Sequence, residues 1–124
     1  DHRPSIGRRP SRADLRAVAY MKGDEMYGLI GKILAAPGQR DALAAVLLEG
    51  LTALPGCLSY VVAQDPQDTD ALWITEVWAD AESHKASLSL PGVQAAIARG
   101  RPLIAGFGER YETAPLGGHG LVRQ

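Results

Sequence analysis

The sequence predicts an α+β domain in which strands and connecting helices follow the order βαββαβ. Segments with apolar residues at helical spacing separate the first strand from the second and the third strand from the fourth. The strands are runs rich in β-branched, aromatic or alternating apolar residues, at residues 27–34, 57–64, 71–78 and 107–113. This order is that of a ferredoxin-like split βαβ unit, an antiparallel sheet with its helices on one face.

The first helix is expected at about residues 39–54. A Pro-Gly pair at 37–38 turns the chain into it, and Pro55 with Gly56 stops it before the second strand. Its apolar residues recur at helical spacing, at Leu43, Val46, Leu47, Leu51 and Leu54. The pattern indicates an amphipathic helix with one face on the sheet.

Two shorter helices are expected between the third and fourth strands. Asp80 is a good N-cap for a helix at roughly 81–89. Pro91 fits the first turn of another helix at about 91–100, which Gly100 ends.

The third strand bears on the oligomeric state. It carries mostly apolar side chains on both faces, with Leu72, Ile74, Glu76 and Trp78 on one and Trp73, Thr75 and Val77 on the other. One monomer has helices for a single face of its sheet, and soluble monomers rarely leave a large apolar face bare. We therefore expect a homodimer in which two sheets pack face to face.

The composition bounds the class of protein. At 124 residues, with 46% hydrophobic and 22% charged residues, the chain is one globular domain. No apolar run approaches the ~20 residues that span a bilayer, and the arginines at the start precede no apolar signal-peptide core. A single cysteine cannot form an internal disulfide. We expect a cytoplasmic protein with no membrane partner.

Charge divides the chain unevenly. Residues 1–25 carry six basic and four acidic side chains, whereas residues 26–115, the predicted domain, carry six basic and ten acidic ones. We interpret residues 1–25 as an extension, either flexible or a short helix capped at Ser11, and residues 116–124 as a tail. The extension has no aromatic residue before Tyr20 to stack on bases, and the domain is acidic, so no nucleic-acid partner is expected.

The motifs of common catalytic and metal centres are missing from the sequence. It has no nucleophile elbow, Walker loop, dinucleotide-binding glycine pattern or zinc-protease helix motif. The histidines, at positions 2, 84 and 119, are not at metal-binding spacing. Asp65, Asp68 and Asp70 lack the glycine and distal glutamate of a calcium loop, and we expect them in a hairpin turn. The sequence therefore predicts no metal centre and no cofactor.

Three segments, taken in order, are similar to the antibiotic biosynthesis monooxygenase family, the small quinol-monooxygenase-like domains of the dimeric α+β barrel superfamily. The segments are P-G-C-L-S-Y at 55–60, L-W-I-T-E-V-W at 72–78 and S-L-P at 89–91, and the similarity covers residues 26–113. It implies a ferredoxin-like domain that pairs into a dimeric α+β barrel. It also implies oxidation of a phenolic or quinol substrate by O₂ without flavin, haem or metal.

The resemblance directs attention to side chains on and beside the third strand. In the family, an aromatic residue at the position of Trp78 helps form an apolar pocket. The alternative interpretation of Trp78 is a core residue that covers the end of the sheet. Glu76, on the same face, would act as a base in that pocket or form a salt bridge near the sheet edge. Tyr60 would point its hydroxyl into the pocket or pack on a neighbouring strand.

His84 is the best single proton acceptor near neutral pH, although a histidine on a helix is more often a surface residue. Family members often carry histidines nearby, in A-H-L and S-P-H segments, where this chain has Ser87 and Gly92. Haem-degrading relatives need an asparagine and a histidine where it has Gly31 and Ile97, so haem degradation is not expected.

Together these residues predict a cofactor-independent monooxygenase. His84 and Glu76 would be its bases, and Trp78 and Tyr60 would bind a small aromatic substrate. One alternative is a non-catalytic dimeric domain that binds a small aromatic ligand or serves in assembly, and another is a small isomerase or lyase on the same barrel. A titratable group in the pocket beside Trp78 would favour turnover, and a purely apolar pocket would favour binding.

Overall fold

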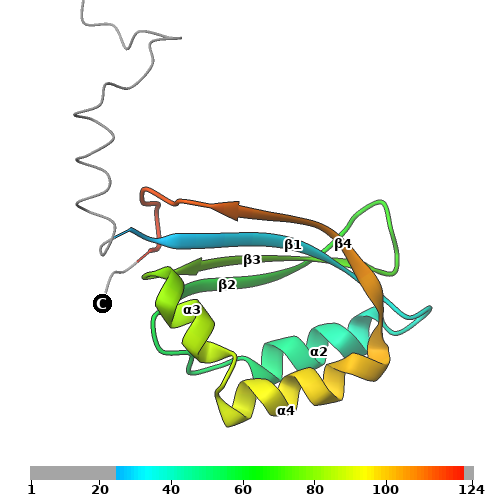
Figure 1. Ribbon diagram of the computed structural model, residues 1–124. Coiled ribbons are helices and arrows are strands. Elements are labelled where there is room, and N and C mark those ends of the chain that lie inside the picture. Colours follow the sequence, from blue (N-terminus) through cyan, green and yellow to red (C-terminus); the bar gives the residue numbers. More distant parts are fainter. Residues whose placement is uncertain (1–24, 122–124) are drawn as a thin grey trace, which may run out of the picture.

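Strands and helices alternate along residues 25–121, the part of the chain that the computed structural model describes (Figure 1). The elements are β1 (Tyr27–Ala35), α2 (Arg40–Gly50), β2 (Cys57–Gln64), β3 (Ala71–Trp78), α3 (Ala81–Ser87), α4 (Pro91–Gly100), a 3₁₀ turn η2 (Arg101–Leu103) and β4 (Ile104–Thr113). The order βαββαβ is confirmed, with α3 and α4 sharing the second helical position. Of the predicted extension at residues 1–25, residues 1–24, with the helix capped at Ser11, lie outside the described residues.

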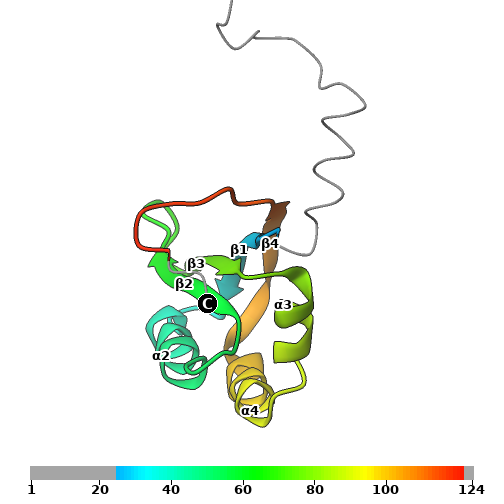
Figure 2. The same ribbon diagram turned by 90° about the vertical axis from the view of Figure 1, so that its left-hand side faces the viewer.

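The four strands form one antiparallel sheet in the order β2-β3-β1-β4. All three helices lie on one side of it, as Figures 1 and 2 show together. We call this side the helix face and the opposite side the back face. Figure 2 also shows the segment after β4 crossing over the back face, where Pro115 lies against Gly28 of β1. The predicted ferredoxin-like arrangement is thus confirmed.

α2 and α3 both end earlier than predicted, and the backbone conformation changes shortly after each end. α2 ends at Gly50 rather than at about residue 54, and Ala53 follows with a φ of 54°. A residue in this left-handed region cannot continue a right-handed helix. α3 ends at Ser87 rather than 89, because Leu90 is extended (ψ 136°) ahead of Pro91.

β4 begins at Ile104, earlier than the predicted start at residue 107. Ile104 pairs with Ala35 of β1, and the next pair along the two strands is Gly106 with Leu34. The pairing shifts register between these two pairs. An irregularity of this kind interrupts the alternation from which strands are predicted, so the sequence pattern missed the first residues of the strand.

The core lies where α2 packs on the helix face. Leu43 of α2 is fully buried against Leu72 and Ile74 of β3 and Ala35 of β1. Trp78 closes the opposite end of β3 and is 1% exposed. These contacts confirm that Leu72, Ile74 and Trp78 share a face, as the alternation in β3 predicts.

The start of α3 is fixed at the end of the sheet. Asp80 accepts a hydrogen bond from the backbone N–H of Ser83 (2.7 Å), which confirms it as the N-cap and lowers the pKa of its carboxyl. Gly56 has a φ of 81°, and a Cβ on it would lie 2.4 Å from the Ser83 hydroxyl oxygen. Only glycine allows this approach, which holds α3 beside Trp78.

The aspartates of the β2–β3 connection satisfy polar groups of the turn. Asp65 accepts hydrogen bonds from the Gln67 backbone (2.8 Å) and the Trp73 indole (3.1 Å), which lower the pKa of its carboxyl. Asp68 accepts one from the Asp70 backbone (2.9 Å). This is the hairpin turn that the sequence predicts. In residues 25–121, no three His, Cys, Asp or Glu side chains come together as metal ligands would.

None of the helices in the described part of the chain is long and apolar enough to cross a membrane.

Candidate functional site

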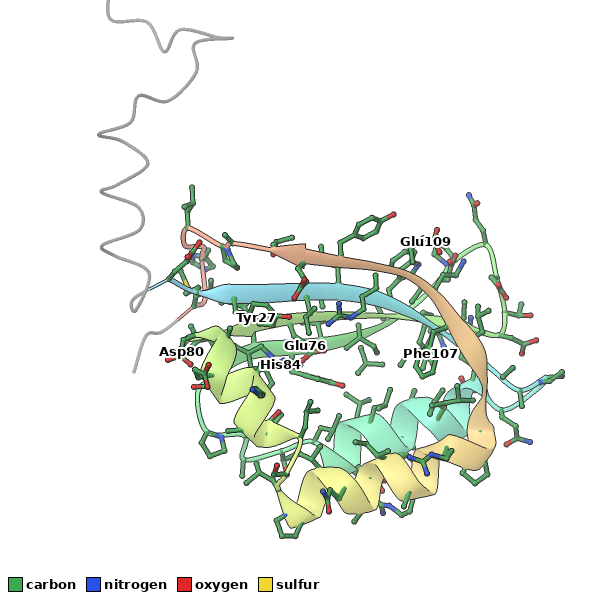
Figure 3. All side chains as sticks on the ribbon, in the orientation of Figure 1. Tyr27, Glu76, Asp80, His84, Phe107 and Glu109 are labelled. Atoms are coloured by element: carbon green, nitrogen blue, oxygen red, sulfur yellow. The ribbon has the colours of Figure 1, made fainter. Side chains whose placement is uncertain are left out.

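A cavity of about 610 Å³ lies between the helix face of the sheet and the helices. Most of its wall is apolar, because α2 and α4 turn leucine, valine and isoleucine side chains towards it. The polar side chains of the wall are Tyr60, Glu76, His84, Ser87 and Arg101. Figure 3 shows Glu76 and His84 at the end of the cavity beside α3, with Phe107 of β4 towards the other end.

The four residues singled out from the sequence all line this cavity. They are Tyr60 of β2, Glu76 and Trp78 of β3, and His84 of α3. Their roles as bases or substrate contacts remain predictions, but the structure brings them to one wall of one cavity.

Trp78 holds the Glu76 carboxylate in place. The indole Nε1–H of Trp78 donates a hydrogen bond to Oε1 of Glu76 at 2.9 Å. The two residues share the helix face because they are two positions apart in β3. The indole is fully buried, so Trp78 is both a core aromatic and a wall of the cavity, and Glu76 keeps its second oxygen for another donor.

Tyr60 stands beside Glu76 on the neighbouring strand, as its register partner. Burial raises the pKa of the Tyr60 hydroxyl far above its ordinary value, and the negative charge of Glu76 raises it further. The hydroxyl therefore stays protonated at neutral pH. It can donate a hydrogen bond to an anion in the cavity.

His84 is held between two aromatic rings. Its ring centroid lies 5.4 Å from that of Trp78, edge to face, and 5.2 Å from that of Tyr27. It is half-buried rather than a solvated surface histidine, because the turn at Gly56 brings α3 close to the sheet. The imidazole faces the cavity with its ring orientation constrained on two sides.

Tyr27 and Glu112 support His84 from behind and were missed by the sequence analysis. The Tyr27 hydroxyl donates a short hydrogen bond to the Glu112 carboxylate. Burial and the Glu112 charge raise the pKa of Tyr27. Its place follows from its pairing with Trp78 at the first position of β1. Only the register of two strands distant in sequence shows this, so no local signal could have found it.

Two of the positions at which the sequence departs from the resembled family, Ser87 and Ile97, have a structural role. Ser87 is buried, and its hydroxyl donates a hydrogen bond to the His84 carbonyl at 2.6 Å. Ile97 contributes an apolar side chain to the cavity wall. Gly92 lies exposed in the first turn of α4, and the cavity wall does not include it.

Fold and cavity together define a ferredoxin-like domain with a mostly apolar chamber and ionisable groups at one end. A sequence model of the antibiotic biosynthesis monooxygenase family matches residues 26–99. The chain belongs to this family, as the resemblance in the sequence predicts. The family gives it a general monooxygenase-like function; members bind small molecules and often form dimers.

Solved structures agree with this assignment. A Chloroflexus aurantiacus protein described as an antibiotic biosynthesis monooxygenase is 71% identical over 78% of this chain and 99% of its own, with a TM-score of 0.76. A Pseudomonas aeruginosa protein is 26% identical over 75% of this chain and 96% of its own, with a TM-score of 0.64. A Caulobacter crescentus protein, 18% identical, shares the fold (83% of this chain, 99% of its own, TM-score 0.65). No curated protein matches the sequence.

Proposed function

We propose that the protein is a cofactor-independent monooxygenase that oxidises a phenolic or quinol-type aromatic substrate with O₂. The observation that carries this proposal is a pair of proton acceptors, Glu76 and His84, set with the hydroxyl donor Tyr60 in the wall of an apolar cavity. Apolar walls suit a flat ring, and the polar groups are concentrated where a ring hydroxyl would lie.

The size of the cavity suits such a substrate. A cavity of ~150 Å³ is enough to hold benzene, and this one has about 610 Å³. A ring placed against Trp78 would bring its hydroxyl towards Glu76 and His84, which flank the indole. The remaining volume leaves room for O₂ and for ring substituents.

In the proposed reaction, Glu76 or His84 takes the proton of the substrate hydroxyl. The phenolate passes one electron to O₂, and the two radicals join at a hydrogen-bearing ring carbon ortho or para to the phenolate oxygen. The protonated base returns its proton to the peroxide formed there, and the resulting hydroperoxide loses the proton of that ring carbon and a hydroxide as the O–O bond breaks. One oxygen atom ends in the carbonyl of a quinone and the other in water. With addition at the para carbon, phenol plus O₂ would thus give p-benzoquinone plus water.

The protein's own groups would supply orientation, a base and charge stabilisation. Tyr60, kept protonated by its raised pKa, would donate a hydrogen bond to the substrate oxyanion. The substrate provides all the electrons that O₂ receives, so the proposed reaction requires no flavin, haem or metal. Titratable groups in the wall also favour turnover over the alternative of a ligand-binding domain.

We expect metal-depleted protein to accelerate O₂ uptake by a phenol or quinol above the rate of autoxidation. An oxygen electrode would measure this across a panel of one-ring and fused-ring phenols, with ¹⁸O₂ used to follow the oxygen atoms. One labelled oxygen per product molecule, without accumulation of hydrogen peroxide, is the expected result. Failure across the panel would leave the binding function, and peroxide as the sole oxygen product would indicate an oxidase.

We also propose a homodimer joined through the back faces of two sheets. The back face carries apolar side chains from every strand: Ile30 of β1, Val61 of β2, Trp73 and Val77 of β3, and Tyr111 of β4. Val61 is 50% exposed and Tyr111 is 54% exposed in the single chain. Contact with a second sheet would remove this apolar surface from water.

Sedimentation at micromolar concentration should therefore give twice the 13.2 kDa mass of one chain. Val61→Lys places a charge on the back face, on the edge strand β2, and should shift the protein towards monomer. Leu48→Lys is the matched control, because Leu48 is a similarly exposed apolar residue (56%) on α2, away from the sheet. A wild-type monomer, or a dimer that Val61→Lys leaves unchanged, would show that this face is not the interface.

A further inference from the structure

A second cavity of about 280 Å³ lies at the sheet, next to the 610 Å³ cavity, which we call the main cavity. Its wall shares Ile33, Tyr60, Glu76 and Phe107 with that cavity. We call this second cavity the floor lobe. Because the two spaces have these walls in common, they adjoin each other at Glu76 and Tyr60.

The floor lobe exists because residue 31 has no side chain. Gly31 pairs with Ile74 of β3 and Arg110 of β4, so it faces the helices as Ile74 does. The positions on either side along this face carry Leu29 and Ile33, which with Ile74 form the walls of the lobe. A Cβ built on Gly31 would meet nothing within 4 Å.

Gly31 borders a register shift in the pairing of β1 with β4, but neither its backbone conformation nor its packing requires a glycine. The glycines with positive φ in the described residues are Gly38, Gly56 and Gly120, so Gly31 is not among them. A glycine within a strand costs stability relative to a β-branched residue, and none of its neighbours comes close enough to exclude a side chain. A strand glycine with empty space above it therefore points to a use for that space.

We propose that Gly31 determines substrate specificity by opening the floor lobe to a second aromatic ring. The substrate would then have at least two rings, one against Trp78 and one over Gly31, with its ionisable hydroxyl between them near Glu76 and Tyr60. The lobe is larger than the ~150 Å³ that benzene needs, and Leu29, Ile33, Ile74 and Phe107 make most of its wall apolar. This inference rests on the proposed function only for the hydroxyl chemistry, since the fit of a ring depends on shape.

The test compares hydroquinone with phenylhydroquinone, which differ by one phenyl ring. Calorimetric titration without oxygen gives the affinity of the wild type and of Gly31→Val for each. The valine side chain would occupy the space over residue 31 in which the second ring is proposed to lie, so the ratio of phenylhydroquinone to hydroquinone affinity should fall by about tenfold or more. The melting temperature should not fall, because valine suits a strand and has free space here.

Gly92→Ala is the control, since this glycine also has open space around it but lies in α4 outside both cavities. It should leave the affinity ratio unchanged. An unchanged ratio in Gly31→Val, or equal weakening of both ligands, would overturn the role of Gly31. Gly31→Ala, with a smaller side chain, repeats the test if the valine variant fails to fold. A fall in the ratio together with failure of the oxygen-uptake test across the phenol panel would refute the proposed oxygenase and leave the two-ring site standing.

Discussion

Replacing Trp78 with alanine should lower the free energy of unfolding by about 3–5 kcal/mol, the usual cost of deleting a buried tryptophan ring. Trp78 is 1% exposed and packs against the ring of His84, so few neighbours can collapse into the space left behind. The same substitution should weaken binding of phenolic ligands, because the indole forms part of the cavity wall and is the hydrogen-bond partner of Glu76.

Urea unfolding would measure the loss of stability, with all variants at the same protein concentration because the apparent stability of a dimer depends on concentration. Trp78→Phe separates the two roles of the indole, because it keeps an aromatic ring but removes the donor to Glu76. Trp73→Phe is the matched control on the same strand, since Trp73 lies on the back face and is only partly buried. If the free energy of unfolding of Trp78→Ala lies within ~1 kcal/mol of the wild-type value, Trp78 is not a buried part of the cavity wall.

Local signals in the sequence were enough to predict the fold. The bounds of β2, β3 and α4 agree with the prediction, because turn residues mark both ends of these elements. The prediction failed at the ends of α2 and β4, where a left-handed Ala53 and a register shift break the regular pattern. The register shift depends on the pairing of strands that are distant in sequence, which hydrophobic periodicity cannot reveal.

The candidate site could be predicted in part for the same reason. Glu76 and Trp78 are two residues apart on one strand, so alternation alone places them on one face. The position of Tyr60 beside Glu76 and of Tyr27 beside His84 depends on strand register and on how α3 docks. Register is set by the whole sheet, so the sequence could name Tyr60 as a candidate but could not predict the support that Tyr27 gives.

Removing the proton acceptors should slow oxidation by about a hundredfold or more, the usual contribution of a positioned general base. His84→Phe is the sharper variant at its position, because a phenyl ring keeps the contacts with Tyr27 and Trp78 but cannot accept a proton. Glu76→Gln keeps the shape and the hydrogen bond from the Trp78 indole but removes the charge. Both variants should remain folded, as circular dichroism and melting temperature would verify.

The double variant then shows how the two groups work together. Two residues that assist one proton transfer give a double variant no slower than the slower single variant, whereas separate steps give losses that multiply. Single-turnover rates under saturating substrate would distinguish these outcomes from changes in binding. If both single variants oxidise the substrate at the wild-type rate, neither residue is the base. Tyr60 cannot readily take that role at neutral pH, because burial raises its pKa and keeps its proton in place, so the substrate would then have to ionise without help from the protein.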